Sequence, residues 1–167
     1  MHYSLIDTPL GNMMAIADQD FLYALDFVEK ENLEFAISRF GRRLNTSILP
    51  GSTPIIKKIG TELKDYFAGK KMDFNTPVHL TGSPFQKKVW EELKKIPSGE
   101  KFSYLDIARK VEKPNACRAV GTANGKNLLV LVIPCHRVIN HNGELGGYGG
   151  GLDRKKWLLD HEKTYKQ

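Results

Sequence analysis

The residues with the clearest chemical potential in this sequence are the consecutive Cys135, His136 and Arg137. A free thiol has a pKa near ~8.5, so it needs a base or a positive neighbour to be a good nucleophile at neutral pH. Histidine can act as that base, and a carboxylate usually orients it. Glu162 and Glu144 are both candidates for this carboxylate, and their spacing does not decide between them. The pattern indicates nucleophilic chemistry at the Cys135 sulfur.

Cys135 also has three interpretations without such chemistry. A lone cysteine is commonly a small buried hydrophobic residue. A disulfide with Cys117 is the second, but two cysteines form no disulfide framework, and such a chain is typical of a reducing, cytoplasmic compartment. A metal site is the third. The cysteine and histidine spacings match no standard zinc pattern, so we expect no metal.

The residues on either side of Cys135 predict how it is held. Residues 128–133 are six consecutive apolar residues, and Pro134 ends the run. We therefore predict a fully buried strand, with Cys135 at its mouth. After Cys135, the pair Asn142-Gly143 predicts a turn. Five glycines around Tyr148 then predict a loop whose backbone closely approaches another group.

Helices are predicted before this strand and after the glycines. Ser83 with Gln86, and Ser103 with Asp106, have the spacing of a capping box at the start of a helix. A third helix is predicted over residues 115–124, and a tight turn joins it to the second, as in a DNA-binding helix-turn-helix. Many helix pairs of this kind bind nothing. The final helix is expected to present Leu152, Lys156 and Leu159 on one face.

The third helix predicts one apolar face and one face of small residues. The small face carries a single arginine, so its backbone can approach a nucleic-acid groove or another helix. The residues expected to face the core are Ala116, Val120 and Ala123, and those on the other side are Arg118, Gly121 and Thr122.

The first part of the chain, to about residue 75, reads as a small α/β scaffold without a cluster of reactive side chains. Residues 13–17 and 21–25 form two short apolar runs that predict a hairpin. Apolar residues at helical spacing predict helices over residues 33–40 and 55–67. We place the domain boundary between residues 78 and 79, giving domains of residues 1–78 and 79–167.

The overall composition fits a folded protein with a polyanionic partner. The 167 residues carry 25 Lys and Arg against 19 Asp and Glu, a net charge of +6, and the sequence pI is about 9.3. This charge suits nucleic acid, although it also serves simple solubility. We find no apolar run of membrane-spanning length and no signal peptide, so we expect a cytoplasmic protein.

Residues 133–138 resemble the active-site signature of the O6-alkylguanine-DNA alkyltransferases, also called methylated-DNA–protein-cysteine methyltransferases. The resemblance extends over about residues 83 to 162, roughly half of the chain, and its landmarks occur in the family's order. They are Ser83-Pro84-Phe85-Gln86, Val89-Trp90, Ile96-Pro97-Ser98-Gly99-Glu100, Ser103-Tyr104, Arg118-Ala119-Val120-Gly121, Asn127, Tyr148, Gly150-Gly151-Leu152, Trp157-Leu158-Leu159 and His161-Glu162.

The resemblance implies a catalytic role for five residues. Cys135 would accept the alkyl group, and His136 would act on it through a water molecule. Glu162, in preference to Glu144, would orient His136. Asn127 would support the turn that holds the site, and Tyr104 would aid nucleotide flipping and donate a proton toward the departing guanine.

The resemblance also implies how DNA would be bound. Arg118 would fill the gap that a flipped nucleotide leaves in the base stack, while its helix lies in the minor groove. A pocket for guanine would be formed by the glycine loop and by backbone near Cys135. The further residues implied in binding are Ala119, Gly121, Val138, Tyr148, Gly149 and Gly150.

The implied activity is DNA repair by irreversible, stoichiometric transfer of an alkyl group from O6-alkylguanine to the cysteine, with O4-alkylthymine as an open second substrate. The implied fold is α/β (α+β), with a small ribonuclease-H-like α/β N-terminal domain and a mainly helical winged-helix/helix-turn-helix C-terminal domain. We expect a monomer that binds double-stranded DNA, without a cofactor, metal or membrane partner.

Two departures from the family pattern and three other protein classes stay open. Leu128 stands where many members have proline, and Gly149 where some have a serine hydroxyl. A non-enzymatic alkyltransferase-like protein would typically carry tryptophan in place of Cys135. A helix-turn-helix regulator would not need Cys135, and a cysteine–histidine hydrolase or acyl transferase would not need Arg118.

Overall fold

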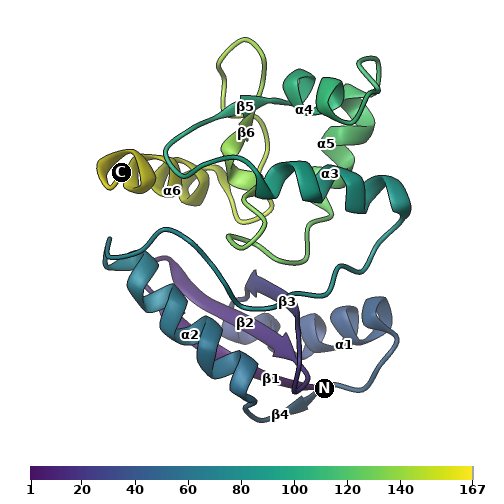
Figure 1. Cartoon of the computed structure of the whole chain (residues 1–167). Helices are drawn as coiled ribbons and strands as arrows, with labels where there is room; N and C mark the ends of the chain where they lie inside the picture. Colours follow the sequence, from purple (N-terminus) through teal and green to yellow (C-terminus); the bar gives the residue numbers. More distant parts are fainter. Residues whose placement is uncertain (167) are drawn as a thin grey trace. The chain divides into compact units, whose positions relative to one another are not determined.

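The computed structural model describes residues 1–166, which fall into two compact units. The first unit is Met1–Thr81, and the second begins at Gly82, just beyond the domain boundary expected from the sequence. Figure 1 shows the strands of the larger sheet in the first unit and most of the helices in the second. Among the described residues, no helix has the length and apolar character needed to cross a membrane.

The first unit is built on a four-stranded sheet with the order β3-β2-β1-β4. Strands β1 (His2–Thr8), β2 (Gly11–Ala17) and β3 (Leu22–Phe27) are antiparallel, and the short β4 (Leu49–Pro50) runs parallel to β1. The predicted hairpin is therefore confirmed as β2 and β3. The Asp18 carboxylate closes its turn by accepting the backbone N–H groups of Asp20 and Phe21, each at 2.8 Å.

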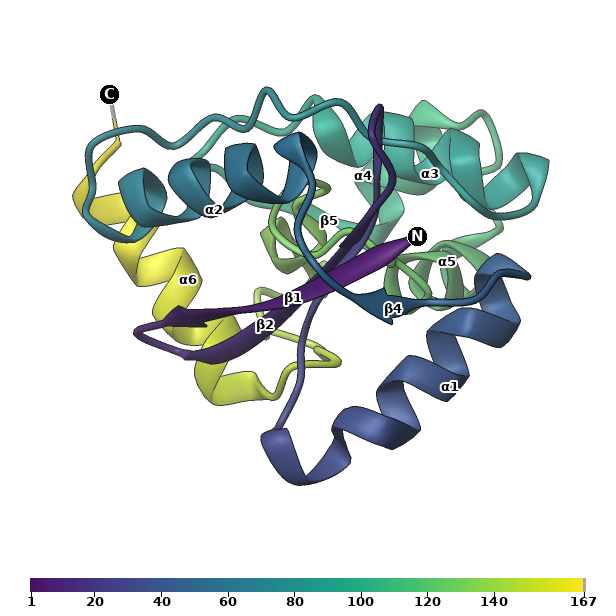
Figure 2. The same cartoon turned by 90° about the horizontal axis from the view of Figure 1, so that it is seen from below.

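Two helices accompany this sheet. A short 3-10 turn, η1 (Lys30–Asn32), leads into α1 (Leu33–Leu44), and α2 (Pro54–Phe67) lies along β1 and β2, an arrangement visible in Figure 2. The Thr53 hydroxyl caps α2 by accepting the N–H of Ile56 at 3.2 Å. Both helices were predicted by apolar spacing, and their buried residues include Phe40, Ile59 and Leu63.

The second unit contains α3 (Pro84–Lys94), α4 (Tyr104–Lys110), α5 (Cys117–Gly125) and α6 (Leu152–Thr164). Both predicted capping boxes are present, at the starts of α3 and α4. Helix α5 packs against α3 and α4, and the indole N–H of Trp90 donates to the Ala123 carbonyl at 2.9 Å. The predicted helix-turn-helix is α4 and α5. The short parallel pair β5 (Phe102–Ser103) and β6 (Val138–Ile139) joins the start of α4 to the chain beyond Cys135.

The strand predicted over residues 128–133 is wrong. These residues are mostly buried, as expected, but they form a compact turn in which the Ile133 N–H donates to the Leu129 carbonyl at 2.8 Å. Leu131 has a left-handed φ of 74°. The Asn127 side chain binds two backbone groups that would pair with a neighbouring strand in a sheet. Its amide donates to the Ile133 carbonyl (2.8 Å), and its oxygen accepts the Leu129 N–H (2.9 Å).

The face predicted for the last helix is also wrong. Helix α6 buries Lys155, Leu158 and Glu162, whereas Leu152 is 53% exposed and Lys156 is exposed. The buried stripe carries two charged side chains, so a search for apolar periodicity selected the neighbouring face. These two charges point to the polar site described next.

Candidate active site

Cys135 opens a single 3-10 turn, η2 (Cys135–Arg137), directly after the turn that Asn127 holds. Its side chain is free of a disulfide and only 5% exposed. The backbone around it is fixed, because the Cys135 N–H donates to the Ile133 carbonyl at 2.8 Å and its carbonyl accepts the amide of Asn124 at 3.3 Å. The predicted role of Asn127 in holding this turn therefore has a defined geometry.

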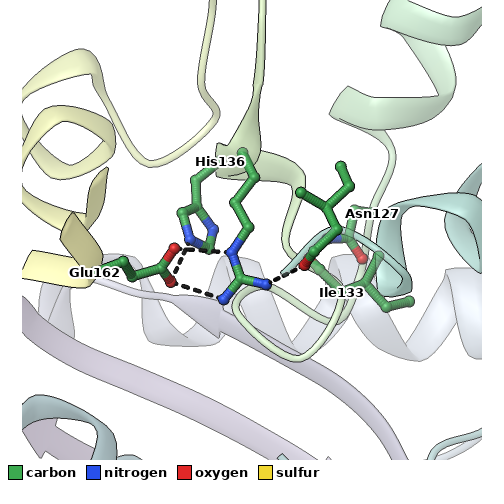
Figure 3. A network of polar contacts seen from close by, with 6 residues as sticks. Asn127, Ile133, His136 and Glu162 are labelled. Atoms are coloured by element: carbon green, nitrogen blue, oxygen red, sulfur yellow. Dashed lines mark hydrogen bonds and ion pairs between the residues drawn. The ribbon is translucent and has the colours of Figure 1, made fainter. Parts of the chain in front are cut away.

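His136 and Glu162 form a fully buried pair. The His136 Nε2 atom lies 2.8 Å from Glu162 Oε2, and both side chains are 0% exposed. Figure 3 shows the two side chains pointing toward one another, from η2 and from α6. Burial lowers the pKa of His136, although its hydrogen bond to Glu162 acts in the other direction. We therefore assign a neutral ring whose Nε2–H donates to the carboxylate.

The opposite nitrogen of this ring is available to act on another group. His136 Nδ1 is buried and makes no hydrogen bond within residues 1–166. In the Nε2–H form, this atom carries a lone pair and can accept a proton. The expected order of carboxylate, imidazole and thiol is thus compatible with the geometry, while the exposed Glu144 lies on a turn and makes no such contact.

Arg137 also binds the Glu162 carboxylate. Its Nε and Nη2 atoms donate to the two oxygens of Glu162 at 2.8 and 2.9 Å, and Nη1 donates to the Ile96 carbonyl at 2.7 Å. Burial by itself raises the pKa of the Glu162 carboxyl, but hydrogen bonds from His136 and Arg137 and the arginine charge hold it well below its usual range. Arg137 was expected only as a possible positive neighbour of the thiol, and its contact with Glu162 was not predicted.

Lys155 was not predicted either, because no sequence signal distinguishes it from the other lysines. Its ammonium group is fully buried and donates to the carbonyls of Val138 (2.7 Å), Leu145 and Gly147 (3.1 Å). Burial lowers the pKa of Lys155 to about 8, and negative charge on Cys135 opposes that shift. Lys155 therefore fastens the loop after η2 to α6 and places a positive charge near the thiol.

Tyr104 lies between this loop and α5. A Cβ atom on Gly146 would come within 3.3 Å of the Tyr104 hydroxyl, and one on Gly121 within 4.0 Å of its ring. Gly146 also has a left-handed φ of 71°. Burial, followed by the charge of Cys135, raises the pKa of Tyr104, so its hydroxyl keeps its proton and can donate it. These contacts are compatible with the predicted role of Tyr104 as a proton donor, which stays a prediction.

Most of the residues expected to contact DNA lie at exposed or half-buried positions of the second unit, whereas Val138 is fully buried. Arg118 and Ala119 are exposed near the start of α5, with Gly121 half-buried on the same helix. In the glycine-rich loop, Tyr148 is half-buried and Gly149 is exposed. The remaining two residues, Val138 and Gly150, form hydrogen bonds inside the protein through their carbonyls. The Val138 carbonyl accepts from Lys155, and the Gly150 carbonyl accepts from Arg154 at 3.2 Å. Their roles toward DNA stay predictions.

No cluster of three or more metal-binding side chains occurs among residues 1–166. The polar groups that converge near Cys135 are instead an imidazole, a carboxylate, a guanidinium and an ammonium. Such a set can move a proton and stabilise a thiolate.

Comparison with known proteins assigns both units to one family. The family model for the ribonuclease-like domain of 6-O-methylguanine DNA methyltransferase matches residues 1–80, and the model for its DNA binding domain matches residues 84–164. Among solved structures, the chain is similar to Mycobacterium tuberculosis OGT in complex with DNA, with a TM-score of 0.84 and 38% identity, covering 99% of this chain and 94% of that one.

Sequence relatives agree with this assignment. A methylated-DNA–protein-cysteine methyltransferase of Shigella flexneri is 39% identical over 164 residues, which is 94% of this chain and 92% of the relative. The constitutive enzyme of that name from Bacillus subtilis is also 39% identical, over 99% of this chain and 98% of the relative. The expected pairing of a ribonuclease-like unit with a helix-turn-helix unit is confirmed, and the chain belongs to the 6-O-methylguanine DNA methyltransferase family.

Proposed function

We propose that this chain repairs DNA by transferring an alkyl group from the O6 atom of a guanine to the sulfur of Cys135. The observation that carries the proposal is the buried His136–Glu162 pair, whose histidine directly follows a cysteine that forms no disulfide, in the unit that also holds the helix-turn-helix. The relatives' names and the DNA complex of the Mycobacterium tuberculosis protein support the same activity.

The proposed reaction balances as a displacement at carbon. His136 takes the thiol proton at Nδ1 through a water molecule, and the Cys135 thiolate attacks the alkyl carbon. An S–C bond forms as the C–O6 bond breaks, and the electron pair of that bond goes to guanine. A proton from Tyr104 neutralises the departing base, and the proton held by His136 returns to Tyr104 through solvent. The thioether is stable, so each molecule reacts once.

The reaction requires the base to leave the duplex, because the O6 atom lies inside the base stack. Extrusion costs a few kcal/mol, which protein contacts must offset. The exposed Arg118 can enter the vacated space, as basic and apolar wedges do in minor-groove binding. The small residues Ala119 and Gly121 let the backbone of α5 approach the groove. We therefore propose double-stranded DNA, bound through its minor groove, as the partner.

The test is intact-mass spectrometry after the protein is mixed with duplex DNA that carries one O6-methylguanine. Cys117→Ala is the matched control, because it removes the other free cysteine and leaves Cys135 in place. We expect wild type and Cys117→Ala to gain one methyl group, located on Cys135 by peptide mapping. Cys135→Ala should gain none.

Two results would contradict the proposal. Retained binding to the lesion without any mass gain in the wild type would indicate a damage-recognition protein. Repeated release of product from one protein molecule would indicate a turnover enzyme with a different chemistry.

A further inference from the structure

The guanidinium of Arg137 is buried and bound inside the protein. The residue is 7% exposed, and its three nitrogen atoms all donate, two of them to Glu162 and the third to the carbonyl of Ile96. A paired arrangement of two parallel N–H···O bonds is the strongest geometry between arginine and a carboxylate. Because the side chain is buried and each nitrogen is bound inside the protein, we expect its effect to pass through Glu162 or through the backbone of Ile96.

The carboxylate that Arg137 binds is the same one that orients the imidazole. Glu162 Oε2 accepts from both His136 Nε2 (2.8 Å) and Arg137 Nη2 (2.9 Å). A buried carboxylate without a cation would attract a second proton onto the imidazole, because opposite charges at this distance favour the charged form. The imidazolium has N–H groups on both nitrogens and no lone pair. It could not accept the thiol proton.

The other charged group that acts on His136 favours the same outcome. Lys155, on the same face of α6 as Glu162, is positive and opposes protonation of the ring, as does Arg137 itself. Among residues 1–166, Glu162 is therefore the one negative side chain that acts on the His136 ring, against the two positive ones. Arg137 is the cation in direct contact with the carboxylate.

We propose that Arg137 is a positioning residue that neutralises Glu162 and so keeps His136 a singly protonated base, with its Nδ1 lone pair available for the thiol proton. The inference rests on the transfer function proposed above and assigns separate roles to Glu162 and Arg137 in that reaction. Glu162 fixes the orientation of the ring, and Arg137 sets its protonation state. The arginine acts without touching the substrate.

The experiment combines a variant cycle with two readouts. Arg137→Met, Glu162→Gln and the double variant are compared with the wild type. Single-turnover transfer from methylated duplex is measured between pH 5 and 9, and ¹⁵N NMR of the His136 ring reports its protonation without DNA. The wild type should show the neutral Nε2–H form at pH 7. In Arg137→Met, we expect the acidic limb of the rate profile and the ring titration to move upward by about one to three pH units.

The double variant separates this role from a merely structural one. Replacing both members of a buried ion pair removes the uncompensated charge that a single replacement leaves. We therefore expect its ring titration and acidic limb to return toward the wild-type position. A uniform loss of rate in Arg137→Met, with an unchanged limb and ring titration, would overturn the proposal.

The wild type alone provides a decisive second measurement if Arg137→Met does not fold. An imidazolium or an Nδ1–H ring at pH 7 would also overturn the inference. Failure of the transfer function would be recognised separately, as the absence of methyl transfer by the wild type, because the NMR measurement needs no reaction.

Discussion

The two units of this chain bury different kinds of side chain. In Met1–Thr81, the buried polar residues are Thr53 and Thr76, and no charged side chain of that unit is buried. Thr53 caps α2, and Thr76 is held by the Glu62 carboxylate. In both contacts, a side-chain oxygen accepts a backbone N–H. The first unit therefore has the interior expected of a scaffold.

The second unit buries four side chains that can carry charge, together with two asparagines. Burying a charge is costly unless it is paired and hydrogen-bonded, and a well-packed apolar group in its place is often as stable. Folding alone therefore does not explain this interior. All six residues lie in the hydrogen-bond network around Cys135 or in the elements that hold its loop. They are Asn124, Asn127, His136, Arg137, Lys155 and Glu162.

Among the changes that test this difference between the units, Glu162→Ala is expected to lower the free energy of unfolding most. It leaves Arg137 and His136 without their shared acceptor, and an unpaired buried charge costs about 3–5 kcal/mol. Urea unfolding should show a loss of that size, together with loss of transfer activity. A loss below about 1 kcal/mol would mean that water reaches the two orphaned side chains and that the second unit's interior is less dry than described.

Acid should weaken the fold through the same residues. The pKa of Glu162 is held below its usual range, so its contribution is present above pH ~4.3 and is lost as the pH falls toward the folded value. The pKa of His136 is also lowered, so stability begins to fall below pH ~6.5, where the unfolded chain takes up a proton. Unfolding measured from pH 7 to pH 3 should show a loss of about 2–3 kcal/mol. Glu162→Gln should flatten the part below pH 5; an equal slope in both proteins would assign it elsewhere.

Lys155→Met should have a smaller effect on stability, of about 2 kcal/mol. It removes a costly buried charge, but it leaves one carbonyl of β6 and two of the loop without their donor. We also expect slower methyl transfer and faster amide hydrogen exchange over residues 139–150. The neighbouring Lys156→Met is the matched control, because Lys156 is exposed. Unchanged exchange in Lys155→Met would show that the loop holds its form without the ammonium.

Thr53→Ala tests the first unit, where we expect a change in stability without a change in activity. Loss of this helix cap should cost about 1 kcal/mol in urea unfolding, because one N–H at the start of α2 loses its acceptor. The rate of methyl transfer should stay at the wild-type value under conditions where the protein is folded. A transfer rate that falls in Thr53→Ala would mean that the first unit contributes to the reaction.

Arg118→Ala should have the smallest effect on stability, within about 0.5 kcal/mol, since the side chain is exposed. Transfer from duplex DNA should nevertheless slow, while transfer from the free O6-alkylguanine base, which needs no flipping, should be unchanged. Equal slowing with both substrates would place Arg118 in the chemistry and not in the handling of DNA.

The parts of the fold that sequence could predict are those set by neighbours a few residues apart. Ser83 with Gln86 and Ser103 with Asp106 form their capping boxes within one helical turn. The β2–β3 hairpin is likewise closed by the side chain of Asp18. Each of these contacts joins residues a few positions apart, so a short stretch of sequence is enough to predict it. The structure confirms all three elements.

The errors came where one side chain redirects the backbone or where a buried face is polar. Burial of residues 128–133 was correctly expected, but apolar composition does not say how the backbone is hydrogen-bonded, and Asn127 decides it. In α6, Lys155 and Glu162 lie on the buried face, where apolar residues at helical spacing would be expected. The Cys135–His136–Glu162 set was expected through family resemblance, whereas the uses of Arg137 and Lys155 required their contacts.

The turn held by Asn127 also bears on the solubility of the chain. Six consecutive apolar residues rich in Val, Ile and Leu have the composition of segments that stack into cross-β fibrils when they are extended and exposed. Here Leu131 takes a left-handed conformation, and the Asn127 amide occupies the Ile133 carbonyl that a neighbouring strand would need. We therefore expect the residue that shapes the surroundings of the thiol also to oppose aggregation of this segment.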